Sequence, residues 1–249
     1  MQLVRFVFQG AEDEGGVCNG LEYIWTHGGD GLDSNDPSKV VVESPECVAG
    51  HTTQRAMIED GVTTRAVLQY LEDESHGAFV RGDSVFLRNW PYVYALLSDP
   101  KESEIKPDQV GVTSLPVGGG ESASALGGRN FFVNANSEKQ DQAWEFIRWM
   151  TQPEQPKKNA PEGSRLPVRR ELYEDAEILD NVPVAKLGKE VVIQNSRPRP
   201  LSPVYSDISL EMAEKFSASL AGEMSPEEAV AALQKEMSGL VEQGQEAAS

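Results

Sequence analysis

Hydrophobic positions change their spacing several times along the chain, and each change predicts an element. The opening run MQLVRFVFQG is rich in β-branched and aromatic residues, which predicts a strand. Apolar residues between Cys18 and Trp25 then recur at helical spacing, and Gly28-Gly29 predict the end of that helix through a left-handed cap. A second helix is expected from Pro45 to Gly61, and a third over 63–79.

The middle of the chain carries shorter patterns. Gly82 precedes a predicted strand, SVFLR, which ends in the aromatic cluster Asn89-Trp90-Pro91-Tyr92. Strands are also expected over 110–116 and 130–135, with a flexible glycine-rich loop between them. Ser137 and Gln140 predict a capping box before a helix that ends at Met150. The Pro- and charge-rich stretch 152–167 predicts a crossover or a broken helix.

Three further helices are expected after residue 167, and the last has the clearest start. Ser225 is its predicted N-cap, Pro226 its first residue and Glu228 the third. Its predicted core face consists of Ala229, Leu233, Met237 and Leu240. Helices therefore alternate with strands along the chain, which predicts an α/β fold.

Composition excludes some partners. The 249 residues include 22 basic and 40 acidic ones, a formal charge of −18. A nucleic-acid or anionic membrane surface attracts a basic excess, so we expect neither partner. Direct membrane insertion is not expected either, because no apolar run approaches the ~18 residues of a spanning helix. The first residues lack the pattern of a signal peptide, and no lipoprotein anchor is expected in this chain.

Side chains that often carry chemistry are sparse. Cys18 and Cys47 are the two cysteines, and their spacing leaves a disulfide and two buried thiols equally open. The three histidines form no ligand pattern, so no metal and no cofactor is expected. The acidic turn at Glu12-Asp13-Glu14 predicts a solvated loop better than a pair of catalytic carboxylates. No nucleophile or phosphate-binding motif is present.

Three segments are candidates for ligand contact. Trp90 and Tyr92 around a proline suit either an apolar core or the wall of a pocket that binds a flat sugar face. Gly127, Gly128 and Arg129 suit a close backbone approach with a hydrogen-bonding fork, or a tight turn with a solvated arginine. The proline-stiffened stretch 195–205 suits an outward-facing site or a surface linker.

Taken in order, these segments carry a resemblance. FVFQGAEDEGG, NWPY, ALGGRNFFVNANS and RPRPLSPVYSDIS resemble the extracellular sugar-binding proteins of ABC importers, the solute-binding family that includes maltose and trehalose/maltose receptors. The similarity covers nearly all 249 residues. It implies a periplasmic-binding-protein-like fold of two α/β lobes that close on sugar.

Family members are longer, so the resemblance implies the C-terminal portion only. The second lobe is expected to be nearly complete, from segments 1–105 and 162–249, and the first lobe largely missing. Residues 106–161 are expected to be the return segment of that first lobe, which would then be a missing partner.

The resemblance assigns roles residue by residue. Trp90 and Tyr92 match the stacking aromatics, Gly127 and Gly128 the double glycine, and Arg199 the arginine of RPxxPxY. The chain departs from the pattern at Arg129, where relatives often carry an aromatic residue, and around Glu14, where they commonly read Tyr-Glu-Gly-Leu. The ligand is therefore expected to differ from a plain maltose-like disaccharide. An extracytoplasmic family also favours a disulfide between the two cysteines.

The function expected from this resemblance is not enzymatic. It is capture of a sugar, expected to be a di- or oligosaccharide, in an interlobe cleft and delivery to the ABC transporter permease subunits, at the periplasmic or extracellular surface. The alternatives are a non-functional or partner-dependent fragment of such a protein, and a carbohydrate-active enzyme.

Overall fold

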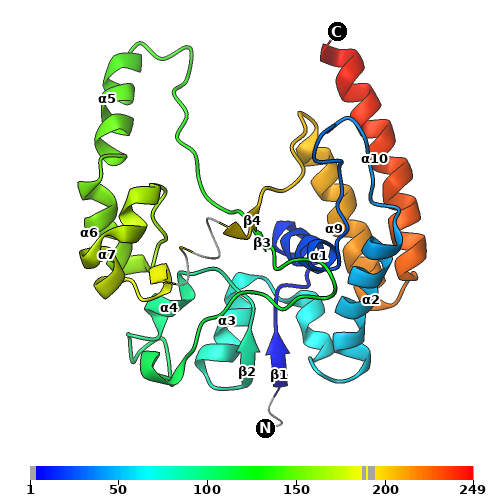
Figure 1. The fold of residues 1–249 in the computed structure, drawn as a ribbon, viewed down its shortest axis with the longest axis horizontal. Coiled ribbons are helices and arrows are strands. Elements are labelled where there is room, and N and C mark those ends of the chain that lie inside the picture. Colours follow the sequence, from blue (N-terminus) through cyan, green and yellow to red (C-terminus); the bar gives the residue numbers. More distant parts are fainter. Residues whose placement is uncertain (1–3, 187–188, 190–193, 249) are drawn as a thin grey trace. The chain divides into compact units, whose positions relative to one another are not determined.

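The computed structural model describes residues 4–186, 189 and 194–248, and it divides into two compact units (Figure 1). The first unit comprises Met1–Asn89, Ser114–Ala125 and Asn195–Ser249, and the second comprises Trp90–Thr113 and Leu126–Gln194. This division follows contacts within the chain. The expected lobe segments 1–105, 106–161 and 162–249 follow the family and stay a prediction.

The first unit contains both strands that were expected near its start. β1 (Val4–Val7) pairs in parallel with β2 (Ser84–Leu87), with Phe6 opposite Phe86. Parallel strands need a crossover, and here it is helical. It runs through α2 (Pro45–Glu59), the 3-10 turn η1 (Arg65–Gln69) and α3 (Glu72–Val80).

Four helices surround the core of the first unit. α1 (Glu14–Thr26) packs against α2 and α9 (Tyr205–Ala221), and α10 (Pro226–Ala248) packs against α9 (Figure 1). α1 ends as expected, with Gly28 in the left-handed region at φ 92° and its N–H bonded to the Trp25 carbonyl at 2.9 Å. The large side chains with almost no exposure in this unit include Phe8, Leu21, Ile24, Trp25, Ile208, Met212, Leu233 and Met237.

Two glycines set how closely α1 approaches its neighbours. A Cβ at Gly50 of α2 would lie 2.8 Å from the Ile24 Cα and the Tyr23 carbonyl oxygen. A Cβ at Gly20 of α1 would lie 2.3 Å from the Phe216 ring of α9. These distances are shorter than van der Waals contact, so the packing of all three helices depends on the missing methyl groups.

The single helix expected over 63–79 is wrong. Tyr70 adopts an extended conformation between η1 and α3. The reason is tertiary, because the chain leaving β1 takes the carbonyls that a helix would use. Gly10 donates its N–H to the Val67 carbonyl at 3.1 Å, and Ala11 donates to the Tyr70 carbonyl at 3.3 Å.

The second unit is helical in its described part. It holds α4 (Val93–Leu96), α5 (Gln140–Met150), α6 (Glu154–Gly163) and α7 (Ala176–Asn181), with 3-10 turns at Pro107–Gln109 and Arg170–Glu174. Its core contains Ala160, Leu172, Ile178, Val182, Val184 and Ala185. α6 therefore occupies the stretch where a crossover or broken helix was expected.

The strands expected over 110–116 and 130–135 are not formed, and short strands appear elsewhere. β3 (Ser124–Ala125) lies inside the expected flexible loop and pairs in parallel with β4 (Ser196–Arg197). A strand requires a hydrogen-bonding neighbour, and segment 130–135 pairs with none among the described residues. Phe131 and Phe132 on this segment are 54% and 88% exposed.

The two expected helix starts have different outcomes. At α10 the capping box is confirmed, since Glu228 donates its N–H to the Ser225 hydroxyl at 3.1 Å and accepts the Ser225 N–H at 2.8 Å. At α5 the box is wrong. Ser137 accepts from the Lys139 N–H at 3.1 Å, and Gln140 donates to the Ala135 carbonyl, so α5 begins without a side-chain cap.

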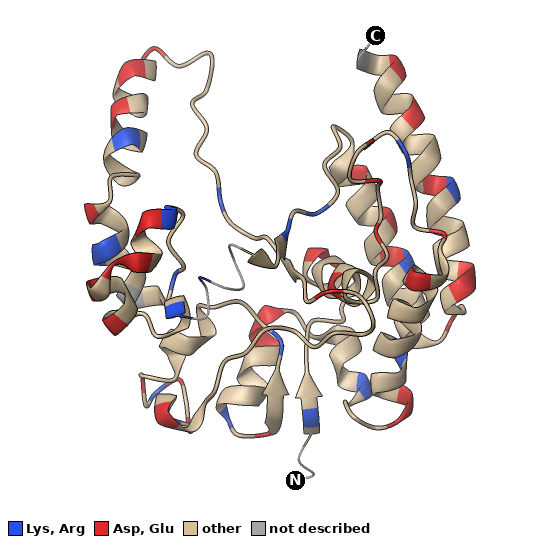
Figure 2. Ribbon diagram, in the orientation of Figure 1, with Lys and Arg blue, Asp and Glu red and all other residues tan. Residues whose placement is uncertain are grey.

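Acidic residues recur along α9 and α10 rather than gathering at one point of these helices (Figure 2). The repulsion between these negative charges is therefore spread along the helices, and a net charge far from zero favours solubility. Among the described residues, no helix combines the length and the low polarity needed to cross a bilayer.

Candidate functional site

Trp90 lies where the chain passes from the first unit into the second. It follows the residues after β2, and the turn Trp90-Pro91-Tyr92 leads into α4, with Val93 donating to the Trp90 carbonyl at 3.2 Å. Trp90 and Tyr92 are both half-buried. This degree of burial suits aromatic rings that pack on protein with one part and offer the rest to a ligand.

The structure brings Trp90 together with the double glycine of the same unit. A Cβ on Gly127 would lie 3.1 Å from Cζ3 of the Trp90 ring, whereas a Cβ on Gly128 would meet no atom within 4 Å. Gly127 therefore lets the backbone pack against the indole ring. Gly128 and Arg129 are exposed, so they remain open to solvent beside that contact.

Arg199 belongs to the first unit, where it forms an ion pair with Glu14 at the start of α1. The same carboxylate accepts hydrogen bonds from the Tyr205 hydroxyl at 2.5 Å and from the Ser209 hydroxyl of α9. The guanidinium also lies 5.8 Å from the centre of the Tyr205 ring. We call Glu14, Arg199, Tyr205 and Ser209 the Glu14 cluster.

Electrostatics keep Tyr205 and Arg199 protonated. Burial raises the pKa of the Tyr205 hydroxyl, and its hydrogen bond to Glu14 raises the pKa further. Burial alone would lower the pKa of Arg199, but the hydrogen bond to Glu14 and nearby charges outweigh it, so the pKa is raised. Tyr205 thus remains a donor, and Arg199 remains a cation.

A second arginine of the same segment is held in a similar way. Arg197 pairs with Asp30 at 3.2 Å and lies 5.6 Å from the centre of the Trp25 ring. Asp30 also accepts the indole N–H of Trp25 at 3.0 Å. Each arginine of the RPRP stretch therefore has a carboxylate and an aromatic ring as partners.

The interpretation of residues 12–14 as a solvated acidic loop is wrong for two of the three acids. Asp13 is the N-cap of α1 and accepts the Gly16 N–H at 3.1 Å, while Glu14 holds the cluster described above. In the sequence, the one signal for this cap was an Asp directly before the first helical residues. The pairing of Glu14 with Arg199 joins positions 185 apart in sequence, which no local pattern reveals.

A buried polar network holds together the segments of the first unit near the points where the chain leaves it. Arg88 binds both carboxylate oxygens of Glu22 at 2.7 Å, and the Ala125 N–H donates to Glu22 at 2.9 Å. Gln9 joins this pair by accepting a hydrogen bond from Arg88 at 2.8 Å, and it also accepts one from Asn19 at 2.9 Å. Arg88 is next to Asn89, the last residue of one segment of the first unit, and Ala125 is the last residue of another.

The disulfide expected between Cys18 and Cys47 is not formed, because both thiols are free and buried. Cys47 contacts the Asp30 carbonyl, beyond the end of α1, at 3.5 Å. From Cys18 to the end of α1 at Thr26 the helix rises by about 12 Å, more than a disulfide can span. Burial raises the pKa of Cys47, and it raises the pKa of Cys18 to about 11, so both are unreactive thiols.

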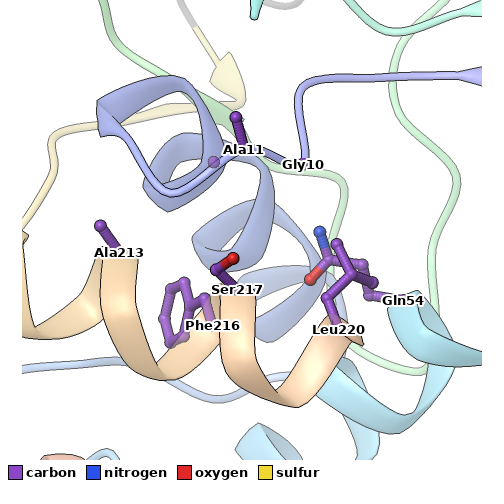
Figure 3. A pocket seen from close by; sticks show the side chains of 8 residues that line it. Gly10, Ala11, Gln54, Ala213, Phe216, Ser217 and Leu220 are labelled. Carbon is purple, nitrogen blue, oxygen red and sulfur yellow. The ribbon is translucent and has the colours of Figure 1, made fainter. Parts of the chain in front are cut away.

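The first unit also has a shallow pocket, and none of the predicted sugar-binding residues lines it. Its lining comes from the chain after β1, from Gln54 of α2 and from one face of α9, where Ala213, Phe216 and Leu220 point toward it (Figure 3). The space is about 210 Å³, part of it open to solvent, which is too small to enclose a disaccharide. Among the described residues, no group of three or more His, Cys, Asp or Glu could hold a metal ion.

The sequence of this chain is similar to those of known proteins. Residues 14–186 match the sequence profile of the family described as bacterial extracellular solute-binding protein. A probable ABC transporter-binding protein of Deinococcus radiodurans is 36% identical over 184 residues, which are 73% of this chain and 43% of that protein.

Solved structures of solute-binding proteins are similar to this chain as well. Maltose-bound MalE3 of T. maritima superposes with a TM-score of 0.84 at 34% identity, over 96% of this chain and 61% of that one. A solute-binding protein of Agrobacterium radiobacter K84 in complex with ribitol gives 0.82 at 23% identity, over 96% and 60%. The expected α/β fold of periplasmic binding proteins is thereby confirmed. The chain spans less than half of the Deinococcus protein and about three fifths of the solved structures.

Proposed function

Because the chain belongs to the bacterial extracellular solute-binding protein family, we propose that it is the carbohydrate-binding component of an ABC importer. Its ligand is a sugar, a di- or oligosaccharide, that is passed to the permease subunits of the transporter. The protein works outside the cytoplasmic membrane, captures its ligand between lobes, and performs no catalysis. The maltose-bound relative, at 34% identity, supports the choice of a sugar.

The single observation that carries this proposal is the half-buried Trp90 ring held against Gly127. The C–H face of a sugar packs on an indole, and the hydroxyls at its edge need polar partners. Tyr92, Gly128 and Arg129 would supply further contacts in the second unit. The resemblance of the RPxxPxY motif makes Arg199 a further proposed sugar-binding residue. Because this chain spans three fifths of the solved relatives, we expect weak binding by the chain alone.

The test is tryptophan fluorescence during titration with maltose, trehalose and related oligosaccharides. A saturable change with a Kd in the millimolar range is expected, and Trp90→Ala should abolish it. Trp144→Ala is the matched control, because Trp144 is a 54% exposed tryptophan of the same unit that is assigned no ligand. No change with any sugar in a chain shown to be folded by circular dichroism would contradict the proposal for this chain. Micromolar binding would contradict the expected weakness.

The double glycine separates two roles in the same assay. Gly127→Ala should weaken binding because the new methyl group would lie 3.1 Å from the Trp90 ring and displace it. Gly128→Ala meets no protein atom within 4 Å, so a loss of binding there would come from the ligand itself. Unchanged binding in Gly127→Ala would show that the Trp90 ring position is unimportant.

A further inference from the structure

The Glu14 cluster has a charge balance that bears on the kind of sugar bound. Glu14 accepts from three side chains, of which Arg199 alone carries a charge. The cation and the carboxylate are in direct contact, so the pair has no net charge. Both remain reachable, since the side chain of Arg199 is 29% exposed and that of Glu14 is 40% exposed.

The cluster also fixes the direction of the guanidinium. Tyr205 holds the carboxylate at 2.5 Å and lies beside the guanidinium, with 5.8 Å from Arg199 Cζ to the ring centre. Ser209 anchors the other carboxylate oxygen to α9. Among the described residues, Glu14 is the hydrogen-bond partner of Arg199, so most of the five N–H donors of the fork face other directions.

Paired charges of this kind favour a neutral ligand. A sugar hydroxyl accepts from an arginine that is already paired, and it brings no charge that must be compensated. A carboxylate on the ligand would be drawn to an unpaired arginine, but here it meets Glu14 directly beside Arg199, and like charges repel. Arg197 is paired in the same way with Asp30, so this segment offers no uncompensated cation.

We propose that Glu14 is a positioning residue for Arg199, and that the pair makes this surface selective for an uncharged, hydroxyl-bearing sugar over a sugar acid. The inference rests on the proposed function, because Arg199 must contact the ligand for its direction and charge balance to matter.

Glu14→Gln tests the inference with two probes, maltose and its acid analogue maltobionate, titrated into the full 249-residue chain by ligand-observed NMR. Glutamine keeps the shape but releases the charge of Arg199. Maltose affinity should fall about tenfold, as expected for loss of a charge-assisted hydrogen bond. The ratio of maltobionate to maltose affinity should rise by at least the same factor. Glu59→Gln, in the exposed pair with Arg55 on α2, makes the same charge change and should alter neither value.

The outcomes are distinguishable. Equal losses for both probes would mean a structural role only, and unchanged affinities would mean no role; either result overturns the inference while wild-type maltose binding still supports the proposed function. A wild-type chain that prefers maltobionate also overturns it. Absence of binding to either probe in the wild-type chain contradicts the proposed function, and the inference fails with it.

A second variant covers the case in which Glu14→Gln does not fold. Tyr205→Phe with Ser209→Ala removes two of the donors that hold the carboxylate but leaves the ion pair. Maltose affinity should fall severalfold while the ratio between the two probes stays constant. Unchanged maltose affinity in this folded variant would overturn the positioning role.

Discussion

At the scale of the residue, His51 shows how burial changes the chemistry of a single side chain. It lies inside the first unit against Phe216, with ring centroids 4.3 Å apart, and its Nε2 atom has no hydrogen-bond partner among the described residues. Burial lowers the pKa of His51 from its ordinary 6.5 to about 4. Between pH 4 and 6.5 the imidazole is therefore mostly neutral in the folded chain and mostly protonated in the unfolded chain.

This pKa predicts a stability that depends on pH. Between pH 6.5 and 4 the unfolded state binds more protons at His51, so the free energy of unfolding falls as the pH falls. From pH 7 to pH 5 the loss from this residue should be about 2 kcal/mol. Urea unfolding at several pH values measures it, with His51→Leu as the comparison. An equal pH dependence in the variant would show that other groups cause the loss.

At the scale of the element, the contact between α1 and α2 depends on Gly50. Gly50→Ala should lower the free energy of unfolding by about 1–3 kcal/mol, because the new Cβ would lie 2.8 Å from backbone atoms of α1 that cannot move alone. Chemical denaturation followed by circular dichroism measures the change.

A matched control lies on α10. Gly239 is also a helical glycine, but a Cβ there would meet nothing within 4 Å. Gly239→Ala should therefore stabilise the chain by up to ~1 kcal/mol through helix propensity. A loss at both positions would contradict the argument from close packing.

At the scale of the whole molecule, the second unit exposes an aromatic patch, defined as Phe131, Phe146 and Trp149. Phe146 lies 6.2 Å from Phe131 and 6.3 Å from Trp149, measured between ring centroids. Each of the three is at least half exposed. Apolar rings gathered in this way mark a surface that another surface covers. A first lobe, expected from the resemblance, is our proposal for that cover.

The isolated chain should therefore self-associate as its concentration rises, and sedimentation velocity would detect it. Phe131→Asp combined with Trp149→Asp should reduce the association. Leu210→Asp is the control, because Leu210 is a single apolar residue, 69% exposed, on α9 of the first unit. A chain that stays monomeric at all concentrations, or a control that has the same effect, would contradict the role of the patch.

The sequence by itself determined the elements whose signals are local. The cap at Ser225 and the glycine end of α1 are set by contacts between near neighbours, and the structure agrees with both. The β-branched and aromatic runs also predicted β1 and β2 correctly, although these strands pair with distant partners, Val4 with Ser84. The order of the motifs NWPY and RPxxPxY also indicated the family, and the match of residues 14–186 to the family confirms it.

Tertiary structure decided whatever depended on a distant partner. The helix over 63–79 breaks because residues after β1 take its carbonyls, and the strand over 130–135 finds no neighbour among the described residues. The cysteines stay apart because Cys47 packs beyond the end of α1. Glu14 meets Arg199 across 185 positions because α1 and α9 pack together. Local propensity carries no information about such pairings, since their free energy appears only when the chain has folded.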